Sequence, residues 1–350
     1  MARKPTWSGA PHGKRSGAVA IILAFVLLVL RTSAAETAHW EAFLRVQGVV
    51  DLSATRRDGS LTVSAAGQLF LFHPSGTLRP FARGPLGYVG SPGAEAYLAL
   101  AQRRRVPGAG CAFPRDEVYA LDVAAPGVVV VTTSGETRHF AALPAGTFPN
   151  GIAFDDVGRF GHRLLVTAAV GATTMVYAID CRGRVRTLGD DTPRLEGGIA
   201  VAPRSFGRYG GQLIAPDEIS GRIVAVDHRG RFRTIVESGL ASGQDLGVES
   251  TGFVPRGFGR RGAAYLADRG TPGNPHPGTD SILRLTGEAL AGDGVRRDDL
   301  LVATEGGADT IAVRCRRSCT VRRIANGPPV AHPEGHIVFV RRVTAGLRSP

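Results

Sequence analysis

The chain has 350 residues, of which 43% are hydrophobic, and its formal net charge at pH 7 is +12. This apolar content permits a substantial core and excludes an intrinsically disordered chain. Five positive charges lie in the first 31 residues, which leaves about +7 for the remainder, and the remainder contains no lysine. Its arginines are scattered through turn-like segments. Because a nucleic-acid reader concentrates basic residues on one element, we expect no nucleic-acid partner.

Residues 1–35 have the pattern of an export signal. Basic residues precede a 13-residue apolar run, 18–30, and small residues follow at 33–35. The run is shorter than the about 20 residues that a membrane-spanning helix needs. We therefore predict a signal peptide at 1–35, with an uncleaved membrane anchor as the alternative, and a single secreted domain at 36–350.

Short runs of β-type sequence, separated by turns, fill the rest of the chain, and no long stretch has a helical period. The first set of runs is 45–52, 60–66, 68–76 and 77–82. Four more runs lie between 93 and 143. Two further sets occupy 149–188 and 196–235, and the last runs lie at 248–269 and, in a less regular order, at 299–342.

The segments 149–188 and 196–235 are repeats. Matching glycines and aspartates, such as Asp180 and Asp227, recur 47 residues apart. A unit of this length with four short β-runs is typical of a propeller blade. We predict an all-β fold, a six-bladed β-propeller with four-stranded blades, with five or seven blades as alternatives. Strands from 334–342 and from 41–50 are expected to share one blade and so close the ring.

Four cysteines suit an exported protein with disulfides. Cys315 and Cys319 bracket a three-residue turn between β-type runs, so we predict that they staple a hairpin. Cys111 and Cys181 then pair by elimination. Free buried thiols are the alternative.

An oxygen-bearing side chain stands at the start of the first strand in each repeat. In the first repeat this residue is Asn150 of "PNG", and Asn-Gly is also the dipeptide most suited to a tight turn. The aligned residues elsewhere are Glu196, Glu249, Glu334, Glu95 and Gln47. First strands line the central channel of a propeller, so these side chains are expected to meet at one mouth. Clustered carboxylates repel one another unless protons or a cation compensate them, which favours a divalent ion, most plausibly calcium.

The unit "PNGIAF...LLVT...VYAID..GRVRTL" resembles the repeats of the gluconolactonase and senescence-marker-protein family, which are six-bladed propellers related to NHL-type propellers and paraoxonases. The resemblance implies a divalent metal at the channel mouth, bound by a Glu, the Asn of a Pro-Asn-Gly motif and the Asp of a Pro-Asp-Gly motif, and it implies lactone hydrolysis. Asn150 matches the Pro-Asn-Gly residue. The Pro-Asp-Gly motif has no literal counterpart, and Glu196 or Glu249 stands in. Pro333-Glu334-Gly335 approximates a third family element, Glu-Gly-Pro, at the far end of the chain.

Three other segments have two interpretations each. His332 and His336 flank Glu334 within five residues and are either surface histidines or a source of a general base. Asp217-Glu218 is interpreted as a solvated turn. The Pro- and Gly-rich loop 270–278 is either a wall over the channel mouth or an inert insertion.

These patterns together predict an exported metal-dependent hydrolase of the lactone type. Asn150, Glu196, Glu249 and Glu334 are the predicted metal ligands, and Glu196 or His336 is the predicted catalytic base. The expected partner is a small-molecule substrate or an envelope ligand, the expected state is a monomer, and membrane contact is expected only through the N-terminal segment. The alternative is a non-catalytic propeller that binds a carbohydrate, a peptide or a cell-envelope partner.

Overall fold

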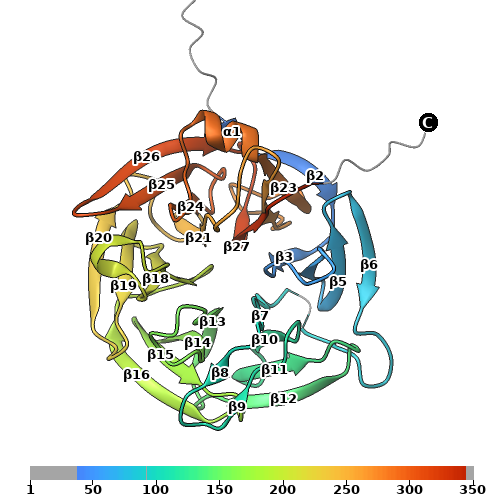
Figure 1. Cartoon of the computed structure of the whole chain (residues 1–350). Helices are drawn as coiled ribbons and strands as arrows, with labels where there is room; N and C mark the ends of the chain where they lie inside the picture. Colours follow the sequence, from blue (N-terminus) through green and yellow to red (C-terminus); the bar gives the residue numbers. More distant parts are fainter. Residues whose placement is uncertain (1–37, 92, 344–350) are drawn as a thin grey trace, which may run out of the picture. The chain divides into compact units, whose positions relative to one another are not determined.

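The computed structural model describes residues 38–91 and 93–343, and the predicted signal segment lies outside them. The described residues belong to one compact unit. Within this unit, β-sheets are arranged in a ring around a central axis (Figure 1). No helix in the described part of the chain is long and apolar enough to span a membrane.

Four sheets of the ring have four antiparallel strands each, in which the chain meanders between neighbouring strands. The first sheet contains β3 (Val49–Leu52), β4 (Leu61–Ala65), β5 (Gln68–His73) and β6 (Thr77–Phe81). The second contains β7 (Leu98–Leu100), β10 (Val118–Asp122), β11 (Gly127–Val131) and β12 (Thr137–Ala142), with a small ribbon of β8 (Arg105–Val106) and β9 (Cys111–Ala112) inserted. The third contains β13 (Phe148–Phe154), β14 (Leu164–Val170), β15 (Thr173–Ile179) and β16 (Val185–Thr192). The fourth contains β17 (Ala200–Val201), β18 (Leu213–Asp217), β19 (Arg222–Val226) and β20 (Phe232–Glu237), with the 3-10 turn η1 (Gly207–Tyr209) between β17 and β18.

The third and fourth sheets confirm that the predicted repeats are blades. Asp180 directly follows β15, Asp227 directly follows β19, and the two residues make the same turn. Each carboxylate accepts hydrogen bonds from the backbone N–H groups two and four residues later, and from the guanidinium Nε of the arginine four residues later. The 47-residue repeat in the sequence is therefore a repeat of local hydrogen bonding.

The remaining strands form one nine-stranded sheet, so the prediction of six separate four-stranded blades is met by only four. The strands of this sheet are β1 (Ala38–His39), β2 (Glu41–Arg45), β21 (Val248–Phe253), β22 (Ala263–Asp268), β23 (Ser281–Thr286), β24 (Leu300–Thr304), β25 (Thr310–Cys315), β26 (Cys319–Asn326) and β27 (Pro333–Val340), and their order is β1-β26-β25-β24-β21-β27-β22-β23-β2. A short helix, α1 (Gly287–Gly292), follows β23.

The path of the chain through this sheet differs from the meander of the four-stranded sheets. Strand β21 pairs with β24, whereas β22, the next strand along the chain, pairs with β27 and β23. A single parallel pair, Thr251 with His336, joins β21 to β27. Gly252 permits this approach, because a Cβ atom there would lie 1.9 Å from the carbonyl oxygen of Ile337.

Strands near both ends of the described chain, β2 and β27, belong to the same sheet, as predicted, but they are not neighbours in it. Strand β2 pairs with β23, and β27 pairs with β22, so the two terminal strands belong to one sheet but are separated by two others. Trp40, between β1 and β2, is fully buried and donates its indole N–H to Thr310 Oγ1 at 2.8 Å.

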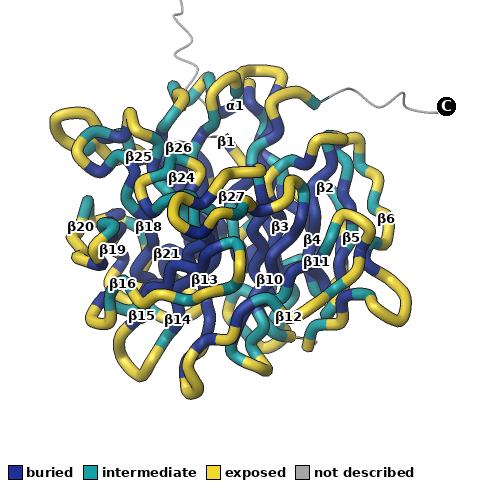
Figure 2. The backbone as a smooth tube through the Cα atoms, turned by 60° about the horizontal axis from the view of Figure 1, so that its bottom comes forward, coloured by how far each residue is buried: buried dark blue, intermediate teal, exposed yellow. Residues whose placement is uncertain are grey.

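The core lies between neighbouring sheets, where their apolar faces pack together. Strands near the axis, such as β3, β7 and β21, are almost completely buried, and the outermost strands, such as β6, β12 and β20, consist mostly of exposed and partly buried residues. Figure 2 shows this gradient as dark strands surrounded by exposed turns. The outer strands therefore shield the sheet edges with polar side chains.

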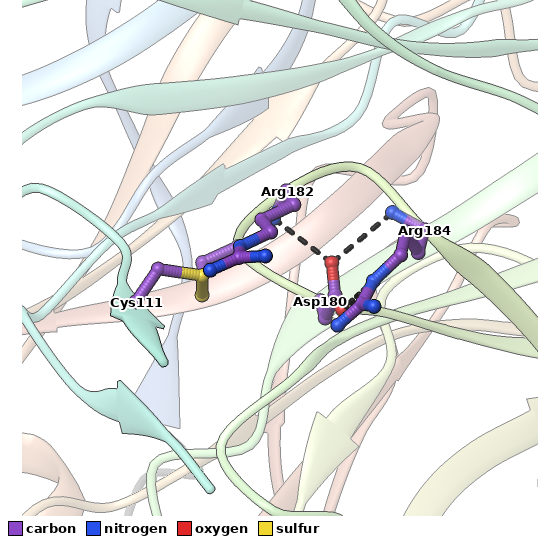
Figure 3. The surroundings of a disulfide bond; sticks show 5 residues. Cys111, Asp180, Arg182 and Arg184 are labelled. Atoms are coloured by element: carbon purple, nitrogen blue, oxygen red, sulfur yellow. Dashed lines mark hydrogen bonds and ion pairs between the residues drawn. A yellow bond between two sulfur atoms is a disulfide. The ribbon is translucent and has the colours of Figure 1, made fainter. Parts of the chain in front are cut away.

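Two disulfides, Cys111–Cys181 and Cys315–Cys319, confirm the predicted pairing, and the free-thiol alternative is wrong. Cys315–Cys319 closes the hairpin of β25 and β26. Cys111–Cys181 ties the β8–β9 ribbon to the turn that Asp180 organises (Figure 3). Two disulfides suggest that the protein works in an oxidising, extracellular environment.

Candidate active site

Three of the predicted site residues line a single cavity of about 200 Å³ at one end of the ring. Glu249 lies in β21, Glu334 lies in β27, and Glu196 lies in the loop before β17. Glu95, in the segment before β7, lines the same cavity. The alignment of repeats therefore correctly placed these carboxylates together, because the first strands start at the same end of the ring.

The cavity contains further polar residues that the sequence analysis missed. The additional lining residues are Arg194, Glu218, Gln244, Asp245 and Glu305. Glu218 follows β18 and Glu305 follows β24, and both strands run antiparallel to the strands nearest the axis. The end of such a strand lies at the same face as the start of its neighbour. The acidic residues just after β18 and β24 were thus the available signal. The interpretation of Asp217-Glu218 as a solvated turn is wrong because both residues are buried.

Asn150 does not make a turn. It lies within β13 at an irregularity in the pairing with β14, and neither Asn150 nor Gly151 has a positive φ angle. Its Nδ2 donates to the carbonyl oxygen of Leu195 at 2.9 Å. The side chain is fully buried, and its Oδ1 has no hydrogen-bond partner among the described residues. An unpaired buried oxygen is costly, so this atom is suited to a ligand's role.

Tyr97 connects two of the buried carboxylates. Its hydroxyl lies 2.6 Å from Glu334 Oε2 and 2.9 Å from Glu249 Oε1. The second oxygen of Glu249, Oε2, is buried and has no partner in the described part of the chain. Gly197 packs directly on this carboxylate, since a Cβ atom there would lie 2.1 Å from Glu249 Oε1. The backbone N–H of Gly197 donates to the carbonyl oxygen of Asn150, which links the strand of Asn150 to the cavity wall.

Two arginines partly compensate the negative charge. Arg269 donates through Nη1 to Glu95 Oε1 at 2.8 Å and to Glu334 Oε1 at 2.9 Å. Arg194 pairs with Glu196 at 3.2 Å. Because six glutamates and Asp245 line the cavity, these two cations leave most of the carboxylates uncompensated.

His332 is buried, so its interpretation as a surface histidine is wrong. Its Nε2 lies 2.7 Å from Glu305 Oε1 and 3.7 Å from Glu334 Oε1. These three residues together offer metal-ligand atoms that all lie within 4.8 Å of one another. The donor set is of the kind that binds divalent metals.

The burial of these carboxylates raises their pKa values. Burial first, and then the neighbouring carboxylates, raise the pKa of Glu218 and of Glu334 to about 8. The same two causes raise the pKa of Glu305 to about 7. Burial also raises the pKa of Glu196, and it raises that of Glu249 well above its ordinary value. At neutral pH the cavity therefore holds protons unless a cation replaces them.

His336 lies elsewhere. It borders a second cavity, of about 320 Å³, whose walls are mostly apolar side chains from the strands nearest the axis. Its Nδ1 lies 2.9 Å from Asp51 Oδ2, and its Nε2 lies 3.0 Å from the carbonyl oxygen of Ile152. Burial lowers the pKa of His336, but Asp51 and the two hydrogen bonds raise it more, so that the net shift is upward. Both ring nitrogens therefore face oxygen atoms, an arrangement that favours the charged ring.

A glycine separates the two cavities along β27. Alternate residues of a strand share a face, and His332 and Glu334 do so. Gly335 has a φ angle of +65° and packs against Asp51, which interrupts the alternation and turns His336 away from Glu334. The structure thus places the two predicted bases, Glu196 and His336, in different cavities.

Comparison with known proteins supports the fold. No family model matches the sequence, and no curated protein matches it. Among solved structures, a chain of a nidogen/laminin complex is 15% identical with a TM-score of 0.50, and the alignment covers 86% of this chain and 88% of that chain. A streptogramin B lyase is 13% identical with a TM-score of 0.45, covering 86% of this chain and 91% of that one. Regucalcin, a calcium-binding protein from Agrobacterium tumefaciens str. C58, is 12% identical with a TM-score of 0.46, covering 83% and 79%. At these low identities the chain of the nidogen/laminin complex supports the β-propeller fold and nothing more.

Proposed function

We propose that this protein is an exported, metal-dependent hydrolase that opens lactones. The observation that carries the proposal is the cavity at the end of the ring, in which buried carboxylates converge with too few positive charges to balance them. Protons or a divalent cation resolve such a charge imbalance, and a cation also supplies a catalytic function.

The donor atoms present fit a hard divalent cation such as calcium. Asn150 Oδ1 and Glu249 Oε2 are buried oxygens without a partner among the described residues, and carboxylate and amide oxygens are the ligands that calcium prefers. In the proposed site Asn150, Glu196, Glu249 and Glu334 hold the ion. When bound, the ion polarises the lactone carbonyl and stabilises the negative charge that develops on its oxygen.

The side chains around this site have distinct proposed roles. Glu196 would accept a proton from the attacking water at a carboxylate oxygen and return it to the ring oxygen as the ring C–O bond breaks. It suits this role because it borders the cavity and its raised pKa brings it closer to neutrality. Arg269 and Tyr97 orient Glu334 and Glu249 through hydrogen bonds. His336 takes no part in this proposal, since both of its ring nitrogens are engaged in the other cavity.

The finer architectural predictions also belong to the proposal. We propose that the nine-stranded sheet acts as two blades, β21-β24-β25-β26 and β27-β22-β23-β2, which are joined by the pair of Thr251 and His336. The ring then has six blades. We further propose that the N-terminal segment directs export, that the protein is a monomer, and that its partner is a small-molecule substrate.

A lactone assay tests the function. The purified protein, stripped with a chelator, is assayed on a panel of lactones with and without added calcium. Turnover that requires calcium and falls in Glu196→Gln supports the hydrolase. Absence of both calcium binding and turnover contradicts it and favours a propeller that only binds a partner.

A further inference from the structure

A second set of metal-ligand atoms lies at the edge of the acidic cavity. Glu305 lies in the turn after β24, His332 directly before β27 and Glu334 within β27, and the three side chains converge. The distances from His332 Nε2 are 2.7 Å to Glu305 Oε1 and 3.7 Å to Glu334 Oε1. All three side chains are buried.

These distances approach those of a metal site. Bonds of about 2.1 Å in a tetrahedral site separate ligand atoms by about 3.4 Å. The two observed separations lie on either side of this value, so a cation between the three atoms requires shifts of less than about 1 Å.

The backbone and neighbouring side chains already hold the three residues in place. The N–H of His332 donates to Asp268 Oδ1 at 2.7 Å. The N–H of Glu305 donates to the carbonyl oxygen of Gly247 at 2.7 Å. Arg269 donates to Glu334 Oε1, and a carboxylate oxygen can accept such a bond and still bind a metal. Little conformational freedom remains to be lost when a cation binds.

A separate observation points to a ligand in this cavity. Glu249 lines it together with Glu305 and Glu334, is only 3% exposed, and has an Oε2 atom without a partner in the described part of the chain. Its other oxygen is bound by the hydroxyl of Tyr97, which also contacts Glu334. A buried carboxylate oxygen with no donor is thus available next to the three converging ligands.

We infer that Glu305, His332 and Glu334 form a binding site for a first-row transition-metal ion of the zinc class. An imidazole nitrogen is a favoured ligand of Zn²⁺ and similar transition-metal ions, whereas calcium takes oxygen ligands. Zn²⁺ is expected to bind more tightly than Mn²⁺, in line with the usual affinity order. The inference goes beyond the proposed calcium site, which shares Glu334 with this one but includes neither Glu305 nor His332.

Cobalt and zinc titrations test the site directly. The full chain, without a histidine tag and stripped with a chelator, is titrated with Co²⁺ while its visible absorption is recorded, and Zn²⁺ is then added to displace the Co²⁺. We expect one saturable site per chain. His332→Gln and Glu305→Gln should each weaken binding of both ions at least about tenfold, since even outer-shell partners of metal ligands contribute about this much.

A matched control separates this site from adventitious binding to surface histidines. His73, at the end of β5, lines neither the acidic cavity nor the cavity of His336. The variant His73→Gln should therefore bind Co²⁺ and Zn²⁺ like the parent. Undiminished affinity in His332→Gln, or no saturable Co²⁺ binding by the parent, overturns the inference. If His332→Gln does not fold, as judged by circular dichroism, Glu305→Gln decides the question.

Calcium titration of the same variants distinguishes this inference from the proposed function. Loss of the Zn²⁺ site with unchanged calcium affinity supports the inference irrespective of catalysis. Parallel loss of calcium and Zn²⁺ affinity in His332→Gln means that the two ions share one oxygen-and-nitrogen site, and it overturns the distinct site inferred here.

Discussion

Asn150 has one engaged side-chain atom and one free one. Its Nδ2 binds the carbonyl oxygen of Leu195, while its buried Oδ1 lacks a partner among the described residues. The dipeptide Asn-Gly is common in tight turns, but here it lies in β13 with an ordinary strand backbone. The buried Oδ1 of Asn150 is therefore suited to accept a ligand, whereas its backbone has no turn to make.

We predict that Asn150→Ala weakens calcium binding and that Asn150→Asp does not. The alanine removes the oxygen ligand, whereas aspartate keeps an oxygen at the same place. A ligand stabilises the native state by RT ln(1 + [L]/Kd), so the rise in Tm on calcium addition should shrink in Asn150→Ala. Calorimetric titration and thermal melts measure both effects. Equal calcium affinity in the alanine variant and the parent would remove Asn150 from the site.

Asp180 stabilises its turn as an ionised group. Burial by itself raises the pKa of Asp180, but hydrogen bonds from the N–H groups of Arg182 and Arg184 and from the Arg184 side chain lower it below the ordinary value (Figure 3). A lowered pKa in the folded state means that the stabilisation is present above the unfolded-state pKa. It is lost as the pH falls through the folded-state pKa.

We expect Asp180→Asn to reduce the free energy of unfolding by about 1–3 kcal/mol at pH 7, the usual contribution of hydrogen bonds to a charged group. The difference from the parent should begin to shrink as the pH falls below about 4, where the unfolded state protonates the aspartate, and it should vanish as the pH falls through the lowered folded-state pKa. Urea denaturation at pH 7 and pH 3 measures it. Asp190→Asn, an exposed position in β16, is the control and should have little effect at either pH. A loss that is the same at both pH values would contradict the role of the charge.

At the scale of elements, the two disulfides close chain segments of very different length. Cys111 and Cys181 are 70 residues apart, whereas Cys315 and Cys319 are four apart. Since a cross-link restricts the unfolded chain more when the loop is longer, the two bonds should differ in their effect on stability.

Replacing Cys111 and Cys181 by serine should cost about 4 kcal/mol, and replacing Cys315 and Cys319 about 2 kcal/mol, by the loop-entropy relation. Chemical denaturation of the two double variants gives the comparison. Each is the control for the other, because both lose one disulfide and gain two hydroxyls. The reverse order of stability would show that strain or contacts in the native state outweigh the loop term.

The contact between β21 and β27 depends on a missing side chain. A Cβ atom at Gly252 would lie 1.9 Å from the carbonyl oxygen of Ile337, which belongs to the backbone and has little freedom to move. The nine-stranded sheet therefore requires glycine at this position.

Gly252→Ala should destabilise the protein by about 1–3 kcal/mol or more, as overpacking of a core does. Gly292→Ala is the matched control: Gly292 ends α1, and a Cβ atom there meets nothing within 4 Å. This control should be neutral or slightly stabilising, because alanine favours a helix more than glycine does. Thermal melts decide between them, and equal melting temperatures for the two variants would contradict the close approach of the strands.

At the scale of the whole molecule, the ring collects carboxylates from several sheets in one cavity. Their pKa values are raised, to about 7 for Glu305 and about 8 for Glu218 and Glu334, because they are buried beside one another. A raised carboxyl pKa contributes stability that is fully present below the unfolded-state pKa. That stability is lost as the pH rises through the folded-state value.

The chelator-treated protein should therefore become less stable between pH 6 and pH 9. Each kcal/mol lost lowers Tm by about 2–4 °C in domains of 150–250 residues. A divalent cation should flatten this decline, since it takes over the compensation of charge from the protons. Glu218→Gln should also flatten it, because it removes one of the titrating carboxyls. Thermal melts at several pH values, with chelator and with calcium, measure the effect, and a Tm that is independent of pH without a cation would contradict the raised pKa values.

Local sequence determined much of this architecture. The repeated Asp-to-Arg turns, the alternation of β-type runs and the position of the cysteines depend on interactions within a few residues, and such interactions are written directly in the order of the side chains. The repeat also aligned Glu196, Glu249 and Glu334 at the starts of equivalent strands, and the structure places all three around one cavity.

Only the tertiary structure decided how the strands of the nine-stranded sheet are connected and which further side chains lie near the cavity. Strand β22 pairs with β27 and not with β21. Gly252 lets the backbones of β21 and β27 touch, although they are more than 80 residues apart in sequence. Glu218 and Glu305 reach the cavity from the turns after β18 and β24, and His332 contacts Glu305 from the residue before β27. The local sequence favoured a solvated turn for Glu218. Gly335 turns His336 into a different cavity from Glu334 although they are two residues apart. Long-range contacts determine these features, and no short stretch of sequence contains the partners that make them.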